Sequence, residues 1–586
     1  MKASYLSHLF TTILLLSPLS TFALSINEIA NQQSEQILRE QQQQLKLQER
    51  KRNLDELERS LFIINPPVPQ EKPSAETAPS VCFNIIDIEL QGADNLLGVE
   101  KEALVKPYLN RCLTAKDIDQ LRVSIDRFYI KKGWLLSRAY LLPKQNIKSG
   151  KLVFKVLEGV LDSIELNENS LTDRMQVRMA FPYMVGEVLY IRDIEQGLEQ
   201  MNRPASNRAK MDIIPVKDKP GYGKIRIKNT YDNRYRYSIG YDNLGYDSTG
   251  QQQGKLTADL DNLLFINDNL MLTATQYMGA DKNIKDNQSL TANLSFPMGY
   301  WTINANSSNS RYLSTVKDNS GSFQLSGNSA TQRIKLSRVA HRNQKTKTNF
   351  SFELANKVNN SYLQDVRLDS SSRTLTVFTI NIEHVIRTAN TFWSYSMDYA
   401  RGLDLFDAVE DGPVRNNNTP RAQFEKLGWA ISASRPIKTL GKKWRYRGSL
   451  IGQYAIDPLF GSEQISVGDT NTVRGYRNNP LSGDSGTYFR NDFSWASQTK
   501  KGLLKGLNII LGLDAGFVQA KNGNISNSGE ANAWLMGGAL GLSQNIRWAK
   551  HQQLNWSATL AAPIFSPSYI VKDNSVFYAS LNWKFW

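Results

Sequence analysis

The feature that most constrains this chain is a two-residue alternation of apolar and polar side chains. It runs through residues 230–586 without a helical period. Every second residue is apolar in Tyr235–Tyr241, Leu290–Phe296, Phe350–Leu354 and Phe577–Phe585. Strands with one apolar and one polar face are typical of a β-barrel that faces lipid outside and water inside. A soluble β-sandwich would also alternate, but the number of such runs favours the membrane barrel.

The length of this region predicts the size of the barrel. At about 22 residues for each strand with its connection, the 357 residues from 230 to 586 give roughly 16 antiparallel strands. Outside the extreme N-terminus, no uncharged apolar run reaches the roughly 18 residues that a membrane helix needs. A chain like this that spans a membrane must therefore do so as a closed barrel.

The net charge of +15 is compatible with nucleic acid, an anionic membrane surface or solubility alone. The sequence has no zinc-finger spacing and no concentrated basic stripe, so we do not expect nucleic acid to bind.

The first 23 residues predict a secretory signal peptide. Lys2 supplies the basic start, Ile13–Leu19 the apolar core, and Thr21-Phe22-Ala23 a small-residue cleavage site. An N-terminal anchor helix is the alternative, but it would need a longer apolar span.

An exported chain would lie in an oxidising compartment, which favours a disulfide between its two cysteines. Cys82 and Cys112 are the only cysteines, and we expect them to pair. The bond would close a loop of about 30 residues and contribute roughly 3–4 kcal/mol. With four dispersed histidines, a metal site is not expected.

Residues 24–61 predict one helix, because they contain no Gly or Pro and are rich in Gln, Glu, Arg and Leu. Its apolar positions are sparse, which suits a helix that bridges solvent or lies in a wet cavity. A disordered or coiled-coil tail is equally compatible with this stretch. Residues 62–80 contain five prolines and predict an extended linker.

Two successive segments, 81–159 and 160–229, share one β-α-α-β-β order and indicate an internal duplication. Small units of this kind can bind an extended chain at an exposed sheet edge. The expected elements are strands at 83–90, 136–142 and 151–157 with helices at 100–106 and 115–131, then strands at 161–166, 210–215 and 223–228 with helices at 172–180 and 191–201.

A long segment from about 455 to 487 interrupts the barrel pattern, and loops of this length are usually functional. It carries Val473-Arg474-Gly475-Tyr476, whose arginine could reach a fixed partner. Gly512-Leu513-Asp514-Ala515-Gly516 places a carboxylate inside an apolar strand. The two could form a charge-assisted pair. The alternative is that Arg474 lies on a solvated loop tip and Asp514 faces water in the lumen.

Four stretches together resemble the transporters of two-partner secretion, the TpsB family (FhaC, ShlB and HecB type) of the BamA superfamily. The resemblance covers nearly the whole mature chain, and each stretch alone is weakly specific. The stretches are Gly133–Pro143 (GWLLSRAYLLP), Gly197–Arg203 (GLEQMNR), Phe296–Trp301 (FPMGYW) and Gly461–Tyr476 (GSEQISVGDTNTVRGY).

The resemblance implies that the repeats are periplasmic POTRA domains, that the helix plugs the barrel at rest, and that the loop folds into the lumen. The implied loop-tip latch is Val473, Arg474, Gly475 and Tyr476, and its implied partners on the barrel wall are Gly512, Asp514 and Gly516. The implied assembly signal is Leu581, Trp583, Phe585 and Trp586.

Two departures from the family pattern stand out. Gly468-Asp469 occurs where many relatives have a second glycine, and Phe585 rather than the terminal Trp586 is in phase with the apolar face.

The resemblance implies an outer-membrane translocator that needs no cofactor and has no enzymatic activity. Its implied partners are an unfolded secreted exoprotein, the barrel-assembly machinery and outer-membrane lipid. A toxin, an adhesin and a haemolysin all remain open as the exoprotein. Overall resemblance to CdiB-type members favours a large contact-dependent inhibition toxin.

A barrel-assembly insertase is the alternative within the superfamily, although the plug-like helix and the mere two repeats disfavour it. A barrel enzyme and a small-molecule porin are alternatives from other classes.

Overall fold

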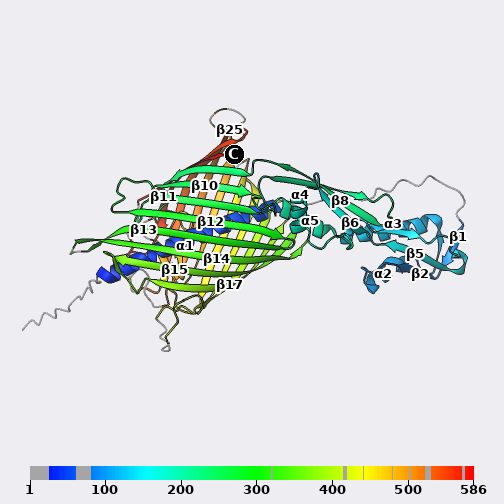
Figure 1. The fold of residues 1–586 in the computed structure, drawn as a ribbon, viewed down its shortest axis with the longest axis horizontal. Coiled ribbons are helices and arrows are strands. Elements are labelled where there is room, and N and C mark those ends of the chain that lie inside the picture. The colour runs from blue at the N-terminus through cyan, green and yellow to red at the C-terminus, as the bar shows by residue number, and fades with distance from the viewer. Residues whose placement is uncertain are drawn as a thin grey trace, which may run out of the picture.

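The computed structural model describes residues 26–60, 81–318, 321–412, 419–439, 441–477, 480–499, 502, 504–521, 530–570 and 574–586. The expected signal peptide (1–23) and linker (62–80) lie outside the described residues. The chain forms a barrel with a helix inside it and two small α/β repeats at one end (Figure 1). Among the described helices, none is long and apolar enough to cross a membrane.

Sixteen antiparallel strands close into the barrel, and β9 and β27 pair to seal it. The predicted fold class and strand number are therefore confirmed. A further two-residue strand, β16 (Val366–Arg367), pairs with the end of β15. The wall strands are β9 (Tyr235–Asp242), β10 (Gln253–Asp261), β11 (Asn269–Tyr277), β12 (Asp286–Met298), β13 (Trp301–Asp318), β14 (Gly321–Arg342), β15 (Thr346–Leu363), β17 (Arg373–Arg387), β18 (Phe392–Leu403), β19 (Glu425–Thr439), β20 (Lys442–Ala455), β23 (Ser485–Ala496), β24 (Leu507–Gln519), β25 (Asn532–Ala549), β26 (Gln552–Phe565) and β27 (Val576–Phe585).

The two faces of the wall differ as the alternation predicts. Apolar residues at every second position are exposed on the outside, for example Leu290 (56%) and Phe577 (53%). Charged residues such as Lys357 and Arg373 are buried inside the barrel. The lumen is therefore polar and, as described below, filled.

The first repeat contains an element that the sequence did not predict. The expected strand at 83–90 is two strands that change partner at Ile86, because β1 pairs with β3 whereas β2 runs parallel to β5. Strand β3 lies between the two expected helices. The elements are β1 (Cys82–Ile85), β2 (Asp87–Gln91), α2 (Gly98–Val105), η1 (Lys106–Tyr108), β3 (Arg111–Thr114), α3 (Ala115–Lys132), β4 (Arg138–Leu141), η2 (Ile147–Ser149) and β5 (Lys151–Leu157).

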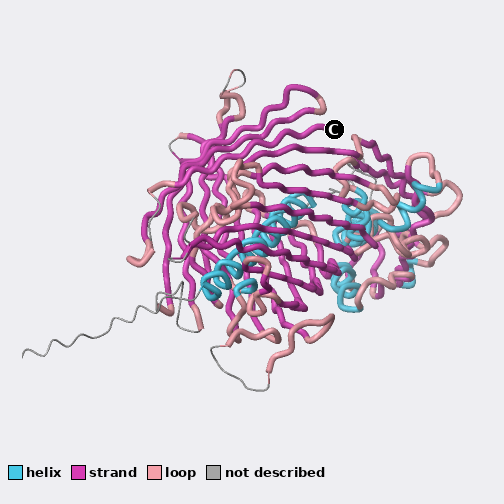
Figure 2. Tube along the Cα trace, turned by 60° about the vertical axis from the view of Figure 1, so that its left-hand side comes forward, coloured by secondary structure: helices cyan, strands magenta, loops and turns pink. Residues whose placement is uncertain are grey.

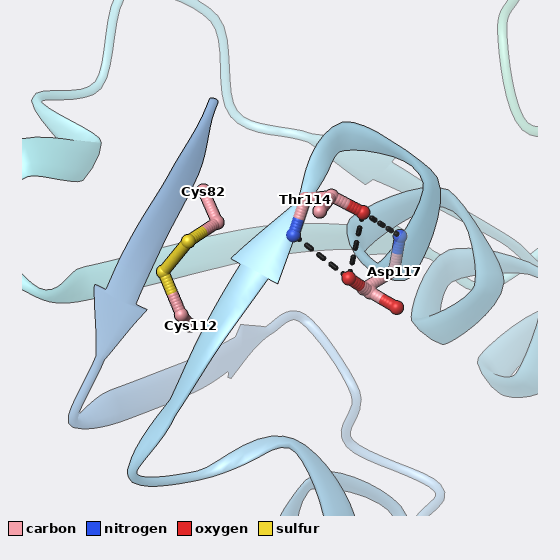
Figure 3. The surroundings of a disulfide bond; sticks show 4 residues. All are labelled: Cys82, Cys112, Thr114 and Asp117. Carbon is pink, nitrogen blue, oxygen red and sulfur yellow. Dashed lines mark hydrogen bonds between the residues drawn. A yellow bond between two sulfur atoms is a disulfide. The ribbon is translucent and has the colours of Figure 1, made fainter. Parts of the chain in front are cut away.

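A disulfide joins β1 to β3 (Figure 3). It links Cys82 to Cys112 just before the start of α3. Thr114 and Asp117 cap that helix, since the Asp117 amide donates to Thr114 Oγ1 and the Thr114 amide donates to Asp117 Oδ2. The bond therefore holds together a two-stranded sheet that lies outside the main sheet of the repeat.

The second repeat follows the expected β-α-α-β-β order. Its sheet has the order β6-β8-β7, with β6 parallel to β8. The elements are β6 (Val160–Leu166), α4 (Leu171–Ala180), α5 (Ile191–Met201), β7 (Asn207–Pro215) and β8 (Tyr222–Tyr231).

The two repeats meet at the stretch GWLLSRAYLLP. Gly133 ends α3 in the left-handed conformation (φ 109°), and its carbonyl accepts from the Ile191 amide. Leu136 packs into the core of the second repeat, where a Cβ on Gly159 would lie 2.1 Å from the Leu136 Cβ. A side chain at position 159 would therefore push the repeats apart.

The second repeat docks on the barrel through the stretches GLEQMNR and FPMGYW. Gln200 Nε2 donates to the carbonyl of Gly299 (2.8 Å), in the turn between β12 and β13. Glu199 pairs with Arg342 (2.8 Å) and with Lys347 at the ends of β14 and β15. The side chains of this ion triad are 5–11% exposed.

We predict that Glu199→Ala loosens the second repeat from the barrel. Lys347 would lose its carboxylate while largely buried, a change that costs roughly 3–5 kcal/mol, whereas Arg342 would keep Gln196 at 2.6 Å and Glu195 at 3.9 Å. Spin labels on the repeat and on the barrel should report a broadened distance distribution, while the barrel keeps its heat-resistant mobility on gels. Glu187→Ala, which removes an exposed carboxylate of the same repeat, is the control. An unchanged distribution for Glu199→Ala would contradict the prediction.

Candidate functional site

The long loop leaves the wall after β20 and folds into the barrel. It begins with a short 3-10 helix, η3 (Gly461–Glu463), and forms a hairpin of β21 (Ile465–Val467) and β22 (Leu481–Gly483). The hairpin contacts β23 and β24 of the wall. Apolar residues of the loop pack with wall residues in one core, which comprises Val467, Val473, Tyr476, Leu481, Tyr488, Val518, Ala520, Ala533, Leu535 and Ile570.

Arg474 and Asp514, which the sequence analysis singles out, are in direct contact. Arg474 Nε donates to Asp514 Oδ2 at 2.6 Å, and Nη2 donates to Oδ1 at 2.8 Å. Asp514 is 1% exposed and Arg474 is 4% exposed. A two-point guanidinium–carboxylate contact fixes direction as well as distance.

The structure adds contacts that the sequence analysis missed. Arg474 Nη1 lies 2.8 Å from Asp492 Oδ1, so the guanidinium faces two carboxylates. Nη2 also donates to the Asn491 carbonyl at 3.2 Å. Asn491 and Asp492 lie on β23 opposite Leu513 and Gly512 of β24. Only the strand register brings them to Arg474, and no local sequence signal marks them.

Glycines make room for the tip on the wall. A Cβ on Gly512 would lie 2.1 Å from Arg474 Nη2, and one on Gly516 would lie 2.8 Å from Val473 Cγ2. Gly537 is a third such position, since its Cβ would lie 1.8 Å from the Arg474 carbonyl oxygen. Gly512 and Gly516 were expected here, whereas Gly537 was not.

The other tip residues are also anchored. Tyr476 is 1% exposed, and its one hydroxyl proton lies between two carbonyl acceptors, Met536 on β25 (2.7 Å) and Phe565 on β26 (2.5 Å). Gly475 adopts φ 104°, and a Cβ there would lie 2.6 Å from the Ala562 backbone. The tip therefore touches four consecutive strands, β23 to β26.

Asp469, the departure from the family pattern, holds the turn before the tip. Its Oδ1 accepts from the amides of Asn471 (2.6 Å) and Thr472 (2.8 Å). Only Gly468 of the pair has a positive φ, 110°. A carboxylate in place of the second glycine thus adds contacts without backbone strain.

The N-terminal helix α1 (Ile26–Ser60) lies inside the barrel, with its first residues at the end far from the repeats (Figures 1 and 2). This placement decides between the alternatives that the sequence left open. Near that end, Ala30, Ile37 and Leu38 pack against residues of β13, β14 and β15. The few apolar side chains of α1 thus pack against the wall near the end of the barrel that lies far from the repeats.

Polar contacts attach α1 to the wall. Ser34 Oγ lies 2.9 Å from the Tyr312 hydroxyl and 2.5 Å from Ser361 Oγ. Gln42 Nε2 donates to Thr331 Oγ1 at 3.0 Å.

Two acidic residues of α1 pair with basic residues of the wall. Glu49 pairs with Arg333 (2.7 Å) and Lys335 (3.1 Å), and Glu35 pairs with Arg373. The polar composition of α1 therefore matches the polar lumen.

Comparisons with known proteins agree with this architecture. The family model for haemolysin secretion/activation proteins of the ShlB/FhaC/HecB type matches residues 221–544. A ShlB-type POTRA model matches 83–159, and a second POTRA model matches 160–215. The chain belongs to the ShlB/FhaC/HecB family.

Relatives and solved structures of this family resemble the chain over most of its length. The outer membrane transporter CdiB of Dickeya dadantii is 34% identical over 84% of this chain and 85% of its own. The haemolysin transporter ShlB of Serratia marcescens is 27% identical over 76% of each chain. The structure of CdiB from Escherichia coli superposes with a TM-score of 0.81 at 30% identity, covering 94% of this chain and 98% of the other.

The protein is thus an outer-membrane transporter of two-partner secretion, with its POTRA domains in the periplasm. Members of the family are transporters. Among the described residues, no group of three His, Cys, Asp or Glu side chains is placed to hold a metal ion.

The remaining predicted site residues lie away from the loop tip. The disulfide is in the first POTRA domain. Leu581, Trp583 and Phe585 lie on β27, which pairs with β9 to close the barrel, and Trp586 follows that strand. Their role as an assembly signal stays a prediction.

We predict that Arg474→Ala releases the loop tip and cripples export. Asp514 would be left buried without its cation, at a cost of roughly 3–5 kcal/mol. Arg474→Lys should impair export less, because it keeps the charge but loses the two-point contact. Export assays and proteolysis of the loop in the folded barrel measure both effects.

A double-mutant cycle with Asp514→Ala supplies the control. If the two residues act through one contact, the double variant should be no worse than Arg474→Ala. Strictly additive defects would show that they act separately. Asp492→Asn should have the smallest effect, because the contact with Asp514 remains.

Proposed function

We propose that this transporter exports a large partner exoprotein, of the contact-dependent inhibition toxin type, as an unfolded chain through its own lumen. The observation that carries the proposal is the occupied lumen. The occupant α1 is attached by side-chain hydrogen bonds and ion pairs, which can be exchanged for water, rather than by strand pairing. Such a helix can leave the barrel without breaking the wall.

The POTRA domains would receive the exoprotein. In the first domain the sheet order β2-β5-β4 leaves β4 at an edge, where Tyr140 is 51% exposed and Leu141 39%. In the second domain β7 is an edge strand. Exposed edges of this kind can add an extended peptide as a further strand, which recognises backbone rather than one sequence.

Transport would not involve catalysis. Departure of α1 and movement of the loop would open a polar path lined by the side chains that bind α1 at rest. Folding of the exoprotein outside the cell would prevent its return and so give the movement a direction. The toxin type follows the names of similar relatives, several of which are CdiB transporters.

The test is export of a contact-dependent inhibition exoprotein that is co-expressed with this chain in a strain that lacks its own transporter. We predict surface-exposed exoprotein with the intact chain and none after deletion of residues 81–159, although the shortened chain still inserts as a heat-resistant barrel. The matched control is the full-length variant Glu187→Ala, which should export normally. Normal export by the shortened chain would contradict the role of the POTRA domain. No export by the intact chain would contradict the proposed partner.

A further inference from the structure

The loop has a second buried charge contact at its base, eleven residues before Arg474. The Glu463 carboxylate, 1% exposed, lies between the ammonium groups of Lys357 on β15 and Lys426 on β19. Lys426 Nζ is 2.9 Å from Glu463 Oε2 and 2.8 Å from the Glu463 carbonyl oxygen. Gln453 of β20 donates to the same carbonyl at 3.0 Å. One residue of the loop is thus bound to three wall strands.

The contact at Glu463 and the contact at the tip attach the loop to different wall strands. The tip is attached to β23 to β26, whereas Glu463 is attached to β15, β19 and β20. The two lysines are 4% and 5% exposed, so neither can be solvated in place of its carboxylate partner. Removing one partner from such a set leaves buried charges without compensation.

The other side of the same loop segment supports α1. Arg39 Nε donates to the Gly461 carbonyl at 3.0 Å, and Gln43 Nε2 donates to the Ser466 carbonyl at 3.3 Å. A Cβ on Gly461 would lie 2.8 Å from the Cβ of Glu35, so helix and loop are in close contact. The loop base is therefore a layer between the wall lysines and the helix.

We propose that Glu463 is a positioning residue that clamps the base of the loop to β15 and β19, so that residues 461–466 form a fixed platform on which α1 docks. The inference rests on the plug role proposed above for α1. The loop is then fixed to the wall at two separate places. Residues 461–469 carry the contacts with α1, including Gln43 Nε2 to Asp469 Oδ2 at 3.2 Å, whereas the tip, 473–476, is attached to the wall.

The charge balance at the clamp gives the proposal a distinctive consequence. Two lysines and one glutamate leave a net charge of +1, and Lys46 of α1 acts electrostatically on all three groups. Neutralising Glu463 removes the carboxylate that attracts Lys46 and leaves only basic groups in the clamp, which disfavours docking of the helix. Neutralising Lys46 removes the helix charge that these basic groups disfavour, so the two changes should have opposite effects on docking.

The test uses pairs of engineered cysteines in the full-length protein in outer-membrane vesicles. Cysteines at Glu35 and Gly461 report whether α1 is docked on the loop base. Cysteines at Val473 and Gly516 report whether the tip is docked, because a Cβ on Gly516 would lie 2.8 Å from Val473 Cγ2. In Glu463→Gln we expect the first crosslink to form at least about tenfold less, the factor that corresponds to about 1.4 kcal/mol. The second crosslink should form as in the native chain.

Two variants serve as charge controls. Adding Lys46→Gln to Glu463→Gln should restore part of the first crosslink, whereas Lys51→Gln, on an exposed part of the same helix, should not. Glu425→Gln removes a carboxylate next to Lys426 in the sequence that pairs instead with Arg401, and it should change neither crosslink. A native yield of the first crosslink in Glu463→Gln, or no rescue by Lys46→Gln, would overturn the proposal.

A further variant tests the clamp in case the Glu463→Gln protein assembles poorly. Replacing Glu463, Lys357 and Lys426 together by Met leaves no buried charge without a partner, so the barrel should assemble. The first crosslink should stay low in this variant, and its return to the native yield would overturn the clamp. The crosslinks report positions only, so they test the clamp even if channel recordings show that α1 does not block the pore.

Discussion

Closure of the sheet between β9 and β27 is the constraint on which the rest of this structure depends. Backbone groups in a lipid layer must be paired, and a closed barrel is the way strands achieve this. Sixteen strands enclose a lumen too wide for the wall's own side chains to fill. Such a lumen is either a water-filled channel, as in porins, or is occupied by other parts of the chain, and in this protein a helix and a loop occupy it.

The two occupants are held by similar chemistry at different places. Each packs apolar side chains against the wall, and each also has an ion contact with it: Arg474 with Asp514 at the loop tip, and Glu49 with Arg333 on the helix. The base of the loop lies between helix and wall, so movements of the two occupants are physically linked. A transporter of unfolded protein needs such a filling, because an open lumen of this size would leak.

Much of the fold follows from the sequence, because barrel strands and short helices carry strong periodic signals. The alternation through Tyr235–Tyr241 and Phe577–Phe585 predicts the lipid face, and the breaker-free stretch after residue 24 predicts α1. Strand β3 and the break at Ile86 were missed, because both depend on pairing between segments that are distant in the sequence.

The candidate site was predictable only in part. Arg474 and Asp514 stand in recognisable surroundings, a Gly-Tyr tip and a Gly-flanked strand. Asp492 and Gly537 reach the tip through the register of β23, β24 and β25, which no single stretch encodes. The location of α1 was likewise undetermined, since a Gln-rich helix suits a wet lumen and a solvated tail equally.

The four stretches that carry the family resemblance all lie at junctions between parts of the structure. Gly133–Pro143 joins the two POTRA domains, and Gly197–Arg203 docks on Phe296–Trp301 to join the second domain to the barrel. Gly461–Tyr476 joins the loop to the wall and to α1. Close packing at these junctions restricts residue choice more than a lipid face or a solvated helix does.

The central claim is that α1 closes the lumen at rest and must leave it for export. The most direct measurement locks α1 in place with Ser34→Cys and Ser361→Cys, whose native hydroxyl groups lie 2.5 Å apart. The oxidised variant should pass no ions in planar bilayers and export no protein, and a reductant should restore both activities. The native chain given the same reductant controls for loss of the Cys82–Cys112 bond. Normal export by the oxidised, fully crosslinked variant would contradict the account.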